Sequence, residues 1–102
     1  MKRFRYVPLR DVLASVAIAD KLGVSEVARS SRGFLTAYER FGRPAYVENA
    51  IDIFSGQRWG DRRDAFISRH LPQYEENPTN RRRIALLMWA YDPNGSKKKV
   101  YI

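Results

Sequence analysis

Glycine and proline recur along this chain and divide it into short apolar segments. Within these segments the apolar residues return every three or four positions, which is the spacing of an amphipathic helix. Gly23, Gly42 and Gly56 each follow such a segment, at the place where glycine commonly ends a helix. The sequence therefore predicts a mainly α fold, a compact bundle of five or six short helices.

The apolar stripe of each segment sets the range of each predicted helix. The segment over 45–54 carries two overlapping apolar rows, so we expect this helix to be mostly buried. Pro72 is expected to end or kink the helix over 61–70 near Leu71, and Thr79 or the next residue is expected to cap the last helix. The predicted ranges are 9–22, 26–30, 34–41, 45–54, 61–70 and 80–91.

The two ends of the sequence show a different pattern. Residues 2–7 alternate enough to form a short strand or an extended arm, and residues 97–102 pass from a basic cluster to Val-Tyr-Ile. An antiparallel pair of these segments would close the fold, although two strands alone are marginal. A chain of 102 residues buries about 65% of its surface on folding, so we expect residues 1–102 to form a single basic helical domain.

The charge balance carries the strongest functional signal. Lys and Arg number 19 and Asp and Glu 11, which leaves a formal net charge of +8, and arginine outnumbers lysine 14 to 5. A basic domain of this size favours polyanions, because each phosphate contact releases condensed counterions. A solubilising surface or a GC-rich genome would give the same excess. We expect a small basic nucleic-acid-binding protein, for DNA rather than RNA, acting as a regulator or accessory factor.

Residues 19–25, Ala-Asp-Lys-Leu-Gly-Val-Ser, resemble the first helix and turn of a helix-turn-helix DNA-binding unit. Ala19, Gly23 and Val24 stand where that motif has a small residue, a glycine of positive φ and an apolar residue. Arg29 departs from the motif, which has an apolar residue there, and two helices joined at a glycine in any α domain would look the same. The resemblance implies that the major groove is faced by Ser25, Glu26, Arg29, Ser30 and Arg32.

Three consecutive arginines form a second candidate site, for an anion. Arg81, Arg82 and Arg83 fall in the first turn of a predicted helix, where the partial positive charge of the helix N-terminus disfavours cations. Something anionic should therefore compensate them. Either Glu75 and Glu76 fold back from the preceding loop, or a phosphate is held by free backbone N–H groups and guanidinium groups.

A third basic cluster surrounds the predicted helix over 61–70. Trp59 lies beside it and either stacks on a base, as in single-strand binding, or anchors the start of the helix in the core; we favour the core. The candidate nucleic-acid contacts in this cluster are Arg58, Arg62, Arg63 and Arg69.

The sequence offers little for catalysis. His70 is the one histidine and cysteine is absent, so Cys-based zinc sites are excluded, and we expect neither a metal nor a cofactor. We expect no enzyme, with a metal-independent ribonuclease as the alternative. No apolar run approaches the ~18 residues of a membrane span, and residues 1–6 lack the pattern of a secretory signal. A cytoplasmic protein without a membrane partner is expected.

The basic and aromatic residues also fit a second class of function. An inhibitor or adaptor would dock such a surface on an acidic protein partner. Trp89 lies one residue beside the stripe of its predicted helix, so it either widens the buried face or anchors an interface. An apolar patch left open on a small helical domain would suit a partner or a second copy of the chain. The expected partner is therefore nucleic acid or an acidic protein surface, and a homodimer stays open.

Overall fold

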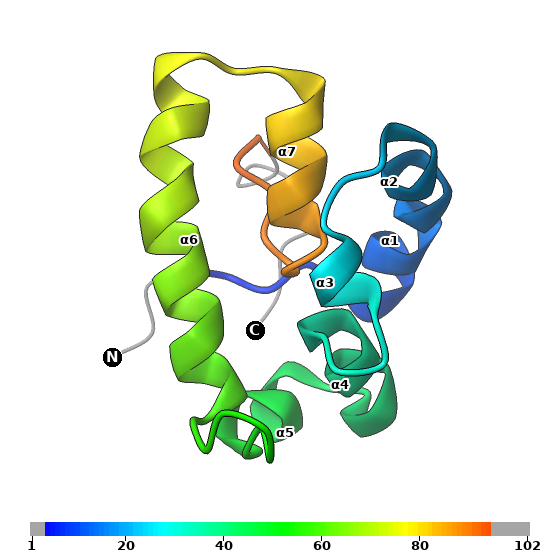
Figure 1. The fold of residues 1–102 in the computed structure, drawn as a ribbon, viewed down its shortest axis with the longest axis vertical. Helices are drawn as coiled ribbons and strands as arrows, with labels where there is room; N and C mark the ends of the chain where they lie inside the picture. Colours follow the sequence, from blue (N-terminus) through cyan, green and yellow to red (C-terminus); the bar gives the residue numbers. More distant parts are fainter. Residues whose placement is uncertain (1–3, 95–102) are drawn as a thin grey trace.

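The computed structural model describes residues 4–94, and these residues are mainly helical (Figure 1). The prediction of a mainly α fold is confirmed. Within residues 4–94 the extended pairing is limited to an isolated antiparallel bridge between Ile51 and Arg58. The predicted pairing of the two ends needs residues 97–102, which lie outside the described range. The helices are α1 (Leu9–Ala14), α2 (Val16–Leu22), α3 (Glu26–Arg29), α4 (Phe34–Phe41), α5 (Pro44–Asn49), α6 (Trp59–Glu76) and α7 (Asn80–Leu87).

The longest helix, α6, forms one side of the molecule, and α7 returns beside it in the opposite direction (Figure 1). α5 packs on α6, α4 packs on α5, and α3 packs on α4. α2 contacts α7, and α1 contacts α2. The described part of the chain measures 33 × 29 × 24 Å.

A cluster of aromatic rings forms the centre of the core. Phe34 of α4 lies 6.1 Å from Trp59 and 5.3 Å from Trp89, measured between ring centroids. Phe66 of α6 stacks on Trp89 at 4.6 Å. Each such ring pair contributes about 0.5–1.5 kcal/mol beyond its buried area. Trp59 and Trp89 are both buried, so each indole packs in the core.

The segment predicted as one helix over 9–22 forms two, with Ser15 between them. The Ser15 N–H donates to Val12 O at 2.9 Å, which tightens the last turn of α1. Its Oγ lies 3.5 Å from Asp11 O. A serine hydroxyl that bonds back to the preceding turn bends helices, and here the axis changes direction at that residue.

The helix predicted over 45–54 ends early, at Asn49. The Asp52 carboxylate accepts hydrogen bonds from the Phe54 N–H at 3.1 Å and from Ser55 Oγ at 2.8 Å. Short polar side chains compete with helix in this way, by offering the backbone another partner. The prediction of a mostly buried helix is wrong, because Val47 is the buried residue of α5 and Tyr46 is 57% exposed. Three apolar side chains are left exposed: Ile51, Ile53 and Phe54.

α6 continues through Pro72, where the sequence predicted an end. Proline inside a helix removes a single N–H donor, and Pro72 lies on the exposed side of α6. Beyond it, Tyr74 is buried in a second apolar cluster with Ile67 and Leu86. This burial holds the last turns of α6 against α7, and the predicted helix end is wrong.

Candidate nucleic-acid interface

The segment that resembles a helix-turn-helix has a second helix of one turn. Gly23 ends α2 with a φ of 68°, as the resemblance predicts. α3 has four residues, so it presents no extended face of the kind that reads a major groove. Ser25, at φ 55°, donates from Oγ to Ala85 O at 3.2 Å and so attaches this turn to α7.

Arg29 and Ser30, which were predicted to face the major groove, make hydrogen bonds within the chain. Arg29 donates from Nε and Nη2 to Val24 O at 3.2 and 3.0 Å. Its Nη1 lies 3.4 Å from Asp20 Oδ1. The Ser30 hydroxyl donates to Val27 O at 2.7 Å. Arg29 therefore stabilises the α2–α3 turn instead of projecting from it, and Ser30 closes the end of α3.

The exposed arginines near α6 divide into paired and unpaired. Arg58 pairs with Asp61, with Nε 3.3 Å from Oδ2. Arg62 donates from Nη1 to Asp52 Oδ2 at 2.6 Å. Arg69 is exposed and makes no hydrogen bond or ion pair with the rest of residues 4–94. Carboxylates therefore already neutralise two of these three candidate contacts.

The prediction that Arg63 contacts nucleic acid is wrong, because this residue is 1% exposed. Its Cζ lies 3.7 Å from the centroid of the Tyr6 ring. Burial lowers the pKa of Arg63. The guanidinium donates four hydrogen bonds of 2.7 to 3.0 Å, to the backbone carbonyl oxygens of Phe4, Arg5, Trp89 and Ala90.

The acidic partner of the arginines in α7 is not the predicted one. Arg83 donates from Nε and Nη2 to the two oxygens of Asp92, at 2.9 and 2.8 Å. These hydrogen bonds raise the pKa of Arg83. Among the ion pairs of residues 4–94, none joins Glu75 or Glu76 to an arginine of α7. Asp92 lies beyond the helix, where its sequence position gave no sign of this role.

The other two arginines of α7 bind backbone carbonyl groups. Arg81 donates to Leu22 O at 2.8 Å, and Arg82 donates to Asn77 O at 2.9 Å. Thr79 caps the helix as predicted, because its Oγ1 accepts from the Arg82 N–H at 3.2 Å. Both guanidinium groups are exposed, and their charges have no carboxylate partner in the described residues.

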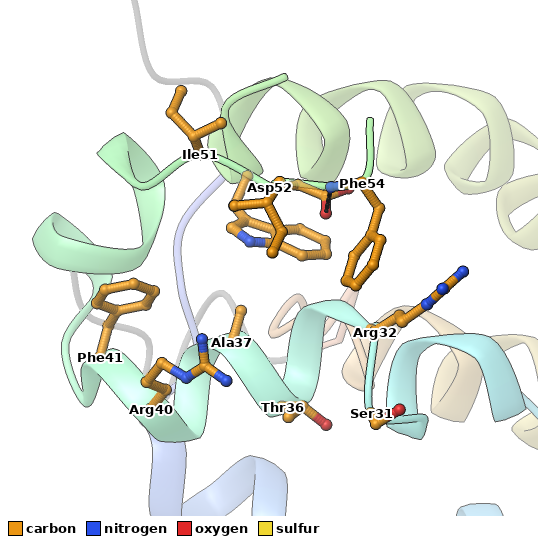
Figure 2. A pocket seen from close by; sticks show the side chains of 12 residues that line it. Ser31, Arg32, Thr36, Ala37, Arg40, Phe41, Ile51, Asp52 and Phe54 are labelled. Carbon is orange, nitrogen blue, oxygen red and sulfur yellow. Dashed lines mark hydrogen bonds between the residues drawn. The ribbon is translucent and has the colours of Figure 1, made fainter. Parts of the chain in front are cut away.

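A groove opens between α4 and the segment that follows α5, and we call it the α4 groove (Figure 2). Residues 31–41 form one wall, residues 51–54 form the other, and Trp59 also lines it. Its volume is about 220 Å³. Figure 2 shows Arg40 reaching from α4 toward the open space, with Arg32 near the opposite end. The groove therefore combines apolar walls with two guanidinium groups.

Three arginines in and beside the α4 groove have no carboxylate partner in the described residues. They are exposed and lie between the turn before α4 and the start of α5: Arg32, Arg40 and Arg43. The Arg32 Cζ lies 4.0 Å from the centroid of the Phe54 ring, and the Arg43 Cζ lies 5.9 Å from that of Tyr46. Positive charge and exposed aromatic rings thus occupy the same surface.

The sequence reading found Arg32 and missed the other two arginines of this surface. A signal was present for Arg40, because Thr36 and Arg40 lie four residues apart in the helix predicted over 34–41, which places them on one helix face. Both line the α4 groove, as does Arg32, which lies before α4. Arg43 follows Gly42, which has a φ of 79° and ends α4.

Asp52 lies in the segment that forms the wall of the α4 groove opposite α4. Its side chain is 2% exposed, and burial alone would raise the pKa of this carboxyl group. Hydrogen bonds from Ser55, the Phe54 N–H and Arg62 outweigh burial and hold the pKa of Asp52 below its ordinary value. The ionised form is therefore the one that the folded protein stabilises.

Replacing Asp52 by asparagine is expected to lower the free energy of unfolding by about 1–3 kcal/mol near neutral pH, since buried donors lose a charged acceptor. Because folding depresses this pKa, the contribution is fully present above the ordinary aspartate value near ~3.9 and is lost as pH falls through the folded value. Urea unfolding of D52N and of the native chain at neutral pH and about pH 3 measures both effects. Asp61→Asn, in an exposed pair, is the control, and an equal loss in both variants would contradict the prediction.

His70 packs against Phe66, with ring centroids 4.2 Å apart. Partial burial and the neighbouring Arg69 lower the pKa of His70. Residues 4–94 contain no group of three or more His, Asp or Glu side chains that could hold a metal ion. In the same residues no helix is both long and apolar enough to cross a membrane.

Comparison with known proteins gives no relative: no family model matches the chain, and neither does any curated protein or solved structure.

Proposed function

We propose that this protein binds nucleic acid through the α4 groove and three arginines in and beside it, Arg32, Arg40 and Arg43. The observation that carries the proposal is that these arginines have no carboxylate partner within residues 4–94 and lie beside exposed aromatic rings. A guanidinium without an internal partner can form a bidentate contact with phosphate. Single-strand binding sites combine such charges with rings on which bases stack.

The α4 groove supports this proposal better than the segment that resembles a helix-turn-helix. In that segment Arg29 bonds to Val24 and Asp20, so its release for base reading would cost those bonds. Arg32, by contrast, is exposed and lines the groove. Arg69, Arg81 and Arg82 carry further charge that adds to the attraction of a polyanion, because the net charge of the chain is +8.

The test is a titration of fluorescent single-stranded DNA, duplex DNA and RNA, followed by anisotropy from ~50 to ~200 mM salt. Replacing Arg40 and Arg43 together by glutamine is expected to weaken binding and to reduce the slope of log K against log salt by about 1.4 for a single strand, because two phosphate contacts are lost. The matched control is Arg10→Gln with Arg69→Gln, which removes the same charge elsewhere.

Equal weakening by the two double variants would contradict the proposed interface, since net charge alone would then explain binding. Binding to duplex DNA that survives loss of Arg40 and Arg43 and fails with Arg29→Gln would instead assign the interaction to the α2–α3 segment, because Arg29 does not line the groove. Absence of binding at ~50 mM salt would contradict the proposed function itself.

A protein partner is the second candidate, and the exposed aliphatic side chains favour it. Ile53 is 81% exposed and Ile51 is 52% exposed, and aliphatic groups bury well against protein but do not stack on bases. The arginines would then meet an acidic rim. A modest salt dependence with a defined stoichiometry, and a large loss on Ile53→Ser, distinguishes this candidate from nucleic acid.

A further inference from the structure

From the shape of the α4 groove we infer that it receives an unpaired nucleobase, which stacks on Phe54 while flanking phosphates bind Arg32 and Arg40. This inference rests on the proposed function and deepens it, because it names single-stranded nucleic acid as the ligand. The juxtaposition that carries it is an exposed ring on one wall of a groove and guanidinium groups near both ends.

The turn that the Asp52 carboxylate stabilises holds the Phe54 ring where a base could stack on it. The side chain is 59% exposed although phenylalanine is usually buried. The Asp52 carboxylate accepts from the Phe54 N–H at 3.1 Å, which fixes the backbone from which the ring projects. In Figure 2 the ring hangs from this segment between Arg32 and the open centre of the groove. The ring is therefore positioned before any ligand arrives.

The Arg32 guanidinium supports the ring from one side, 4.0 Å from its centroid. A cation over a ring contributes about 0.5–1 kcal/mol at an exposed site and restrains the rotation of the ring. The same guanidinium keeps N–H donors for a phosphate, because it makes no hydrogen bond to a side-chain or backbone acceptor in residues 4–94. Arg32 can thus contact ring and phosphate together.

The groove suits a flat ring better than a duplex. Its volume is about 220 Å³, and small residues, Gly33 and Ala37, lie in the α4 wall. Bases in a duplex are stacked and paired, and they cannot enter a groove without being extruded at a cost of a few kcal/mol. The ligand that enters without this cost is a single strand.

The charge around the groove favours an anion between the two ends. Arg40 lies on the same α4 wall as Gly33 and pairs with no carboxylate of residues 4–94. The carboxylate that lines the groove, Asp52, is buried and paired with Arg62. The groove therefore carries uncompensated positive charge, which a sugar-phosphate backbone would neutralise.

The test uses three probes of equal length, of roughly 16 nucleotides: oligothymidine, a duplex, and an abasic strand with the same phosphates. The native chain is expected to bind oligothymidine at least about tenfold more tightly than the abasic strand. Phe54→Ala is expected to remove this difference while leaving affinity for the abasic strand within about twofold. Phe54→Trp should preserve the difference, because the ring is retained.

Arg40→Gln is expected to weaken the binding of oligothymidine and of the abasic strand to the same extent, because Arg40 would contact phosphate and not the base. Ile18→Ala, which removes an exposed apolar side chain of α2 outside the groove, is the control and should change nothing. Phe54 is largely exposed, so its variants should fold, and thermal melting verifies this.

Equal affinity of the native chain for oligothymidine and the abasic strand would overturn the inference and leave the proposed function standing. Loss of affinity for all three probes on Phe54→Ala would also overturn it, because the ring would then act through structure and not through a base. No binding to any probe at ~50 mM salt would overturn both. In that case, Phe54-dependent binding of an acidic peptide with apolar side chains would assign the groove to a protein partner.

Discussion

Arg63→Met is expected to lower the free energy of unfolding by about 3–5 kcal/mol, because a buried charged group that satisfies several partners disappears. The guanidinium donates to four carbonyl oxygens that no water reaches easily, since Arg63 is 1% exposed. Methionine fills part of the volume but offers no donor. The expected fall in the midpoint of thermal unfolding is more than ~12 °C, measured by far-ultraviolet circular dichroism.

Two variants keep this prediction testable if Arg63→Met does not fold. Arg63→Lys retains the charge but lacks the planar fork of five donors, so an intermediate loss is expected. Arg69→Met lies on the same helix, is exposed and makes no ion pair in the described residues, and should change stability by less than ~0.5 kcal/mol. A difference of under ~1 kcal/mol between the two methionine variants would show that the carbonyl contacts contribute little.

Gly33→Ala is expected to cost about 3 kcal/mol, because an added Cβ meets backbone atoms that cannot rotate away. The new carbon would lie 2.1 Å from Val27 O and 2.2 Å from Ala28 O. The φ of Gly33 is −95°, which any residue adopts, so the cost comes from contact alone. Urea unfolding measures it, and α3 or α4 has to shift for the variant to fold.

Gly42→Ala is the matched control, because it introduces backbone strain without a steric clash, whereas Gly33→Ala introduces a clash without backbone strain. Gly42 has a φ of 79° and no atom within 4 Å of an added Cβ. Its alanine variant should lose about 1–2 kcal/mol from left-handed strain without any clash. A loss in Gly33→Ala no greater than in Gly42→Ala would mean that α3 moves aside at little cost.

Features set by neighbours in sequence were predictable. Gly23 and Gly42 end helices because their own φ is positive, and Thr79 caps α7 through an N–H three residues ahead. The burial of Trp59 followed from its place before an amphipathic helix. For the two glycines and Thr79 the physical cause lies within about one turn of the residue, where sequence patterns operate.

Features set by distant partners were not predictable. Arg63 has the same neighbours as an exposed helical arginine, and its carbonyl acceptors lie 26 to 59 residues away. The pairing of Arg62 with Asp52 spans ten residues and replaces part of a predicted helix with a turn. The same limit applied to the candidate site. Arg32 was predicted, but the exposure of Phe54 was not, because it depends on that turn.

The four carbonyl oxygens around Arg63 come from the two ends of the described chain, the segment before α1 and the turn after α7 (Figure 1). Helices of four to eight residues are marginal alone, so α1 to α5 and α7 depend on packing that these long-range contacts secure. Closing the loops between such distant residues costs chain entropy before the contacts can stabilise the fold, and this slows folding. A chain of short local helices is thus expected to fold at a rate set in part by these non-local contacts.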